Sequence, residues 1–103
     1  MTRQALDDGG WFDTDKATMH DEATRWNGNN HISVATGSQW YHEALYRTRS
    51  GAWVLHAWSN YQGSAPAWAT IDTARAAEWL VTNSHADVTL DRATAAAIAH
   101  AEL

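Results

Sequence analysis

Apolar and polar residues alternate most regularly in the middle of the chain, where two such segments flank a short polar loop. The segments cover residues 41–48 and 52–59, and an Arg-Ser-Gly loop occupies positions 49–51. A three-residue loop with glycine in the left-handed position is a common connection between antiparallel strands. The pattern therefore predicts a β-hairpin in which Arg47 lies opposite Trp53.

This expected register divides the side chains of the hairpin between two faces. Leu45, Leu55 and Trp53 share one face with the stem of Arg47, and the two leucines are core candidates. The second face is also rich in aromatic rings, which leaves two interpretations open. It belongs to a central strand covered on both sides, or it is kept for a partner. The second face carries Tyr46, Val54, His56, His42 and Trp58.

Weaker strand and turn signals precede and follow the hairpin. Residues 14–25 fit either a helix or a strand, and a strand near Ala17–Trp26 is favoured. The asparagine-rich segment 27–30 predicts a turn, and the alternation at His31–Ala35 predicts a short strand. Ala67–Ile71 is a further strand candidate.

Two helices are expected after the last strand. Asp72 is a helix-capping residue type, and the apolar stripe over residues 73–82 is typical of a helix that packs against a sheet. An alanine-rich segment predicts a short C-terminal helix near residues 91–102. Residues 1–10 are expected to form a flexible lead-in. The elements predict a single α+β domain over residues 11–103, with an antiparallel sheet of about four or five strands.

Composition supports one small folded domain and argues against several functions. The chain has 103 residues, of which 45% are hydrophobic and 18% are charged, as in proteins with a packed core. The absence of cysteine excludes disulfides, thiolate zinc sites and a cysteine nucleophile. A net charge of −5 makes nucleic acid an unlikely partner. No apolar segment has the length of a membrane span, so a cytoplasmic protein without membrane contact is expected.

Three short segments of the chain occur together in a fixed order. They are FDTDKA at 12–17, LYRT followed by a glycine and WVL within 45–55, and AEWL at 77–80. This combination resembles a group of uncharacterised small bacterial proteins that also appear in phages and plasmids. The group has no established activity, so the resemblance implies no functional residue. It implies a compact sheet-plus-helix domain and an origin in a mobile genetic element.

No arrangement of residues indicates catalysis, so we expect a non-enzymatic protein without a cofactor. Ser59, His56 and Asp72 form a hydrolytic triad only on paper, because the Gly-x-Ser-x-Gly elbow that positions a nucleophilic serine is missing. The phosphate-binding glycine motifs are also missing.

Histidine pairing suggests a metal site, which we weigh against two plainer interpretations. His42 and His56 share a face of the predicted hairpin, and with Glu43 or Asp21 they would offer ligands for zinc. The plainer interpretations, which we favour, are that the two rings belong to the core or form the polar edges of an aromatic contact surface. We therefore predict no metal.

The surplus of aromatic residues suggests that a surface performs the function. Seven tryptophans are many for a small core, and tryptophan and tyrosine are enriched at interfaces. We expect a protein–protein interaction or regulatory module that contacts a protein partner or a second copy as a homo-oligomer. With a mobile-element origin, an inhibitor of host defence of the anti-CRISPR kind is expected. The alternative is a domain that binds single-stranded nucleic acid or carbohydrate with the same rings and Arg47 or Arg49. The predicted contact residues are Trp40, Tyr41, His42, Arg47, His56, Trp58 and Tyr61.

Overall fold

The computed structural model describes residues 2–61, 63–83 and 85, and it confirms the α+β class. Its strands form one four-stranded sheet and two hairpins, and they are accompanied by one α-helix in this part of the chain. The C-terminal helix expected near 91–102 lies outside the described residues. In chain order the elements are β1 (Arg3–Ala5), β2 (Trp11–Asp13), the 3-10 turn η1 (Thr14–Lys16), β3 (Thr18–Asp21), β4 (Thr24–Trp26), β5 (His31–Ser33), β6 (Tyr41–Arg47), β7 (Trp53–Ser59), β8 (Ala67–Ile71) and α1 (Thr73–Thr82).

The central sheet has the strand order β3-β6-β7-β8, and every neighbouring pair is antiparallel. β6 and β7 form the expected hairpin with the expected register, since Arg47 lies opposite Trp53 and Leu45 lies opposite Leu55. Gly51 has a φ of 92°, the left-handed conformation that this loop requires. A local turn signal therefore determines which side chains share a face of the sheet.

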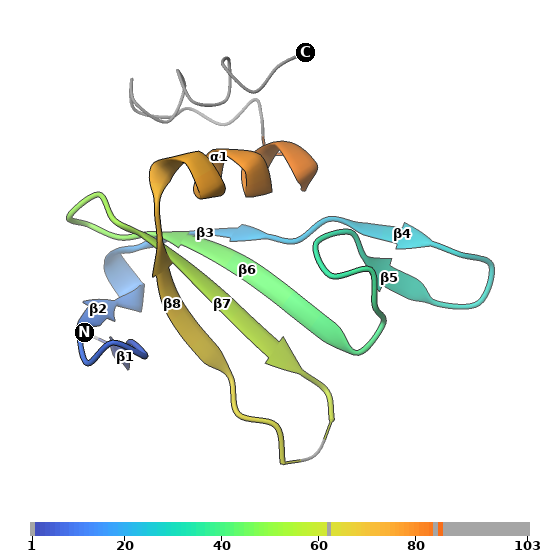
Figure 1. The fold of residues 1–103 in the computed structure, drawn as a ribbon, viewed down its shortest axis with the longest axis horizontal. Coiled ribbons are helices and arrows are strands. Elements are labelled where there is room, and N and C mark those ends of the chain that lie inside the picture. The colour runs from blue at the N-terminus through green and yellow to red at the C-terminus, as the bar shows by residue number, and fades with distance from the viewer. Residues whose placement is uncertain (1, 62, 84, 86–103) are drawn as a thin grey trace.

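One face of the central sheet lies against α1 (Figure 1). The helix begins after Asp72, whose Oδ1 accepts a hydrogen bond of 2.7 Å from the backbone N–H of Arg75. Such a cap satisfies one of the amide groups that the first helical turn leaves unpaired. Residues from β6, β7 and α1 bury one another here. This core contains Leu45, Trp53, Leu55, Ala76, Trp79 and Leu80.

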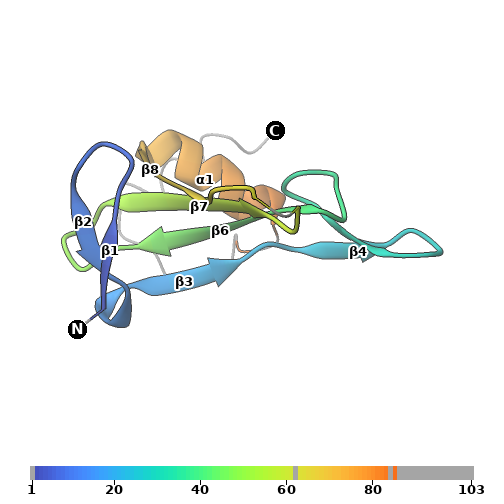
Figure 2. The same cartoon turned by 90° about the horizontal axis from the view of Figure 1, so that it is seen from below.

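The opposite face is partly covered by the N-terminal hairpin of β1 and β2, which stands across one end of the sheet (Figure 2). Phe12 is 6% exposed, and its ring centroid lies 5.5 Å from that of Tyr46 and 5.9 Å from that of Trp68. Asp7 extends this contact, because its N–H donates to the carbonyl of Trp68 at 2.9 Å. The structure thus places β1 and the loop after it within residues 1–10, where we expect a flexible lead-in, and pairs β1 with β2.

A second hairpin, formed by β4 and β5, projects from the other end of the sheet (Figure 1). Its tip is held by the Asn27 side chain, whose Oδ1 accepts the N–H groups of Asn29 and Asn30 at 2.9 and 2.8 Å. The expectation of one strand near Ala17–Trp26 is therefore wrong in part. The strand is interrupted at Glu22 and divides into β3 and β4, which pair with different partners.

The break between β3 and β4 is fixed by contacts with distant parts of the chain. Asn83, which is 2% exposed at the end of α1, accepts the N–H of Ala23 at 3.0 Å through its side-chain oxygen. Its amide nitrogen donates to the carbonyl of Trp79 at 2.9 Å. The helix end and the strand break thus stabilise each other. Within the described ranges no helix combines the length and the apolar character that crossing a membrane requires.

Candidate functional site

Three large aromatic rings meet at the open end of the β6–β7 hairpin, and we call them the aromatic end. Trp40, Tyr41 and Tyr61 are 45%, 52% and 52% exposed. The ring centroid of Tyr61 lies 5.7 Å from that of Trp40 and 5.6 Å from that of Tyr41. All three are among the contact residues that the sequence predicts. Exposed rings in mutual contact are typical of a surface that binds a partner.

Backbone hydrogen bonds hold the segments that carry these rings. The N–H of Asn60 donates to the carbonyl of Trp40 at 2.9 Å. This bond continues the pairing of β6 and β7 by one residue past the start of β6 and the end of β7. The hydroxyl of Thr36 donates to the carbonyl of Tyr41 at 2.6 Å. Both contacts bring loop residues against the start of β6. The aromatic end is therefore held by the scaffold rather than carried on a free loop.

A hollow of about 280 Å³ lies beside the aromatic end, where β6, β7 and β8 meet their connecting loops. Tyr41 belongs to both features, so the two form one continuous surface. The wall combines aromatic rings with small side chains and hydroxyls, and Glu43 is its one acidic residue. Among its lining residues are Thr36, Tyr41, His42, Trp58, Ser64 and Ala65.

A row of stacked rings runs along the sheet face opposite α1. His42 stacks on Trp58 with centroids 5.7 Å apart, and Trp58 stacks on His56 at 4.6 Å. His56 in turn lies 3.6 Å from Trp68, with the two planes 9° apart. The structure thus brings together three of the predicted contact residues and adds Trp68. These rings are half-buried, so they support the surface more than they form it.

A hydrogen-bonded carboxylate fixes the outer end of this row. Nδ1 of His42 lies 2.7 Å from Oε2 of Glu22, and its Nε2 lies 3.2 Å from the side-chain nitrogen of Asn60. Both contacts are satisfied by the His42 tautomer that carries its proton on Nδ1. In this tautomer Nδ1–H donates to Glu22, and Nε2 accepts from the side chain of Asn60. The other oxygen of Glu22 accepts the hydroxyl of Ser33 at 2.7 Å and the N–H of Glu43 at 2.6 Å.

Metal binding finds little support in this arrangement. His42 and His56 share a face as expected, but the ring of Trp58 stacks on both of them. Glu43 points to the other face, where its Oε1 accepts the indole N–H of Trp79 at 3.1 Å. In the described part of the chain no group of three or more histidine and acidic side chains is arranged to hold an ion.

Arg47 does not join the other predicted contact residues. Arg47 is the last residue of β6, and Tyr41 is the first. The guanidinium of Arg47 lies 4.5 Å from the ring centroid of Trp53, on the sheet face that packs against α1. The alternating direction of side chains along a strand separates it from His42 and from the stacked row. The predicted contact residues therefore divide into an exposed cluster, a stacked row and one distant arginine.

The structure also separates the three residues of the hydrolytic triad considered from the sequence. Ser59 and His56 are three positions apart on β7, so their side chains leave opposite faces of the strand. The hydroxyl of Ser59 accepts the N–H of Tyr61 at 3.0 Å, and Asp72 caps α1. The three side chains do not form the hydrogen-bonded chain that nucleophilic catalysis by serine needs.

Two histidines have lowered pKa values because they are buried. Burial penalises the imidazolium form of His56 and of His20, and the neighbouring His85 lowers the pKa of His20 further. Burial and the charge of Asp21 raise the pKa of Tyr46. The two histidines therefore remain neutral in the folded protein at pH values where the unfolded chain binds protons.

We expect the protein to lose stability as the pH falls below neutrality. The unfolded histidines titrate near 6.5, whereas His20 and His56 titrate lower in the folded protein. Below about pH 6.5 the unfolded state then binds more protons, so the contribution of these two histidines to the free energy of unfolding is present above their unfolded pKa and is lost as the pH falls through their lower folded pKa values. Urea unfolding at several pH values measures this slope. The slope should decrease in His20→Gln and His56→Gln and persist in His31→Gln, whose side chain is exposed. An unchanged slope in all three variants would contradict the assignment.

Comparison with known proteins adds no identification to this geometry. Searches of protein-family models, of curated proteins and of solved structures found no match to the chain.

Proposed function

We propose that the protein is a non-enzymatic binding module that contacts other proteins through the aromatic end. The observation that carries this proposal is the mutual contact of Trp40, Tyr41 and Tyr61, each about half exposed. Tryptophan and tyrosine dominate the binding energy of protein interfaces, because they bury a large area at a small cost in side-chain entropy. The first partner that we propose is a second copy of the chain.

The charge distribution supports contact between two copies at this surface. Residues 26–42 and 53–71 contain no Asp, Glu, Lys or Arg, although the chain as a whole has 12 acidic and 7 basic residues. These two segments supply the whole aromatic end. Charged residues are depleted at the centre of interfaces. Two chains with a net charge of −5 repel each other less when they approach through the three uncharged rings of the aromatic end, beside which Glu43 is the one charged residue lining the hollow.

The alternative ligand-binding function has weaker support. Binding of single-stranded nucleic acid requires rings for the bases and cations for the phosphates at the same place. Arg47 and Arg49 lie at the closed end of the β6–β7 hairpin, whereas Trp40 and Tyr61 lie at its open end. The geometry still allows a carbohydrate ligand whose sugar ring stacks on Tyr61. A titration with mono- and disaccharides tests this alternative.

The self-association is tested by sedimentation equilibrium from about 1 µM to 1 mM protein. We expect a monomer–dimer equilibrium in the wild-type protein. Combining Trp40→Ala with Tyr61→Ala should weaken it by about 30-fold or more, because removal of central interface rings costs about 2 kcal/mol or more. The free energy of unfolding of the monomer should change by less than about 1 kcal/mol, since both side chains are exposed.

Trp26→Ala is the matched control for this experiment. Trp26 is 61% exposed on the β4–β5 hairpin, where its ring contacts that of His31 and none of the three rings of the aromatic end. Its removal should leave the dimerisation constant unchanged. A wild-type protein that is monomeric at every concentration would contradict self-association, and equal association of wild type and double variant would show that another surface is used.

We further propose, from the resemblance to phage and plasmid proteins, that the module inhibits a component of host defence in the cytoplasm. The support for this finer proposal is that resemblance alone. Its test is the gene neighbourhood of the coding sequence. Neighbouring phage or defence genes are expected, and a position within a metabolic operon would contradict the proposal.

A further inference from the structure

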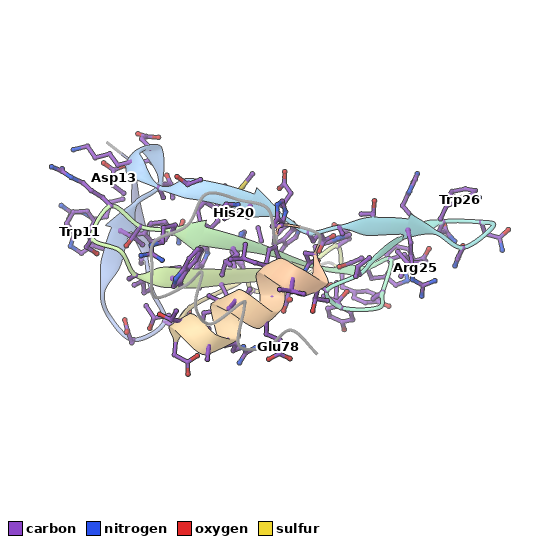
Figure 3. The ribbon with its side chains drawn as sticks, turned by 90° about the horizontal axis from the view of Figure 1, so that it is seen from above. Trp11, Asp13, His20, Arg25, Trp26 and Glu78 are labelled. Carbon is purple, nitrogen blue, oxygen red and sulfur yellow. The ribbon has the colours of Figure 1, made fainter. Side chains whose placement is uncertain are left out.

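A second hollow lies at the opposite end of the molecule, between the N-terminal hairpin and the β6–β7 loop. Its volume is about 410 Å³. Figure 3 shows Trp11 and Asp13, which line it, at one end of the molecule, and Arg25 and Trp26 at the other end. The hollow shares no lining residue with the aromatic end. Its wall includes Trp11, Phe12, Asp13, Lys16, Arg49 and Ser50.

Two cations in this wall are available to a ligand. Lys16 and Arg49 are exposed, and neither side chain makes an ion pair or hydrogen bond within residues 2–61, 63–83 and 85. The wall contains one acid, Asp13, whose Oδ1 accepts the N–H groups of Thr2 and Asp15 at 3.1 and 3.0 Å and whose Oδ2 is buried without a hydrogen-bond partner, so two cations face one carboxylate. The wall thus has an excess of positive charge in a protein whose net charge is −5. An anionic group fits this excess.

Trp11 provides a flat apolar platform beside the cations. The ring is 50% exposed, and the guanidinium of Arg3 lies 4.4 Å from its centroid. This cation–π contact orients the indole and leaves half of its surface open. An aromatic base stacks on such a ring, and each stacked base contributes about 1–3 kcal/mol.

The β6–β7 loop adds neutral donors to the same wall. The hydroxyl of Ser50 lies 3.1 Å from that of Thr48, and Thr48 in turn accepts the N–H of Ala52 at 3.0 Å. The Ser50 hydroxyl can therefore accept from Thr48 and direct its own hydrogen to a ligand oxygen. The backbone N–H groups of Arg49 and Ser50 have no acceptor in the described part of the chain.

We propose that this hollow binds a nucleoside monophosphate, with the base stacked on Trp11 and the phosphate held by Lys16 and Arg49. The volume accommodates one nucleotide, and the acidic net charge disfavours a long polyanion. The same chemistry is offered by a free nucleotide and by the 5′-phosphorylated end of a single strand. The site is independent of the aromatic end, so either proposal can fail without the other.

Calorimetric titration with adenosine 5′-monophosphate tests the site, with adenosine and inorganic phosphate as partial ligands. We expect saturable binding of the monophosphate that weakens with salt, and much weaker binding of adenosine. We expect Lys16→Gln and Arg49→Gln each to weaken the affinity for the monophosphate by about tenfold, because each removes one charge-assisted contact with the phosphate. Trp11→Ala should weaken it by about fivefold or more, and Trp11→Phe should retain most of the affinity.

Arg25→Gln is the control, because Arg25 is an exposed cation on the β4–β5 hairpin. It should bind the monophosphate like wild type, and circular dichroism confirms that each variant folds. Tighter binding of a 5′-phosphorylated tetranucleotide than of the monophosphate would identify a strand end, and equal binding would identify the free nucleotide. The proposal is overturned if the wild type shows no saturable binding up to millimolar monophosphate. Equal binding by wild type and the Lys16→Gln/Arg49→Gln double variant would also overturn it.

Discussion

Replacing Leu45 with alanine should lower the free energy of unfolding by about 2–5 kcal/mol. Leu45 has no exposed surface and lies in the core that β6 and β7 share with Trp79 and Leu80 of α1. The substitution removes buried methyl groups and leaves a cavity, and packed strands on both sides of β6 limit the collapse that would fill it. A domain of this size has a total stability of about 5–15 kcal/mol, so the loss is a large part of it.

Urea unfolding followed by circular dichroism measures this effect. Val81→Ala is the control, because Val81 lies on α1 but is 46% exposed. Its cost should be within about 0.5 kcal/mol. A loss below about 1 kcal/mol for Leu45→Ala would mean that the interface between α1 and the sheet is not the core of the domain.

Replacing Glu22 with alanine should cost about 2–4 kcal/mol, although Glu22 is a charged residue. Its side chain is 10% exposed, and its two oxygens accept hydrogen bonds from Ser33, His42 and the N–H of Glu43. Removing the carboxylate leaves three donors from β5 and β6 without their acceptor. Partly buried donors that lose their partner account for most of the cost.

The isosteric variant separates the hydrogen bonds of Glu22 from its charge. Glu22→Gln keeps an oxygen that can still accept from Ser33 and Glu43, so its loss should be smaller than that of Glu22→Ala. Glu78→Ala is the matched control, since Glu78 is exposed on α1. Equal stabilities of Glu22→Ala and Glu78→Ala in chemical denaturation would contradict the structural role of Glu22.

The parts of the fold that follow from local signals are predictable from the sequence. The loop at 49–51 contains the glycine that a three-residue hairpin loop needs, and this position determines the pairing of β6 with β7. The residue range of α1 follows from the cap at Asp72 and from an apolar stripe. In each case the determining interaction lies within a few residues of the element that it defines.

Elements that depend on distant contacts are not predictable in this way. The N-terminal hairpin is stabilised by Phe12 against Tyr46 and Trp68, which are more than thirty residues away. The break between β3 and β4 depends on the side chain of Glu22, which reaches β6, and on Asn83 at the end of α1. No periodicity within residues 1–26 encodes these contacts.

The candidate site shows the same division. The hairpin register correctly places His42, His56 and Trp58 on one face, because the register is local. Trp68 completes their stacked row from β8, and only the pairing of β7 with β8 shows this. The prediction that Arg47 belongs with the rings rests on its charge, and it is wrong because the strand position of Arg47 assigns it to the other face, over Trp53.

Cross-linking of engineered thiols tests the central proposal, that the aromatic end is the contact surface between two copies. The chain has no cysteine, so a single Ser64→Cys places one thiol beside the hollow at this end, and Ser50→Cys places one in the β6–β7 loop at the other. The rate of disulfide-linked dimer formation under mild oxidation is measured for both. We predict that Ser64→Cys forms the disulfide-linked dimer at least about tenfold faster than Ser50→Cys, because contact at the aromatic end raises the effective concentration of its two thiols. Adding Trp40→Ala to both variants should remove this difference in rate. Equal rates for the two single-cysteine variants would contradict the account.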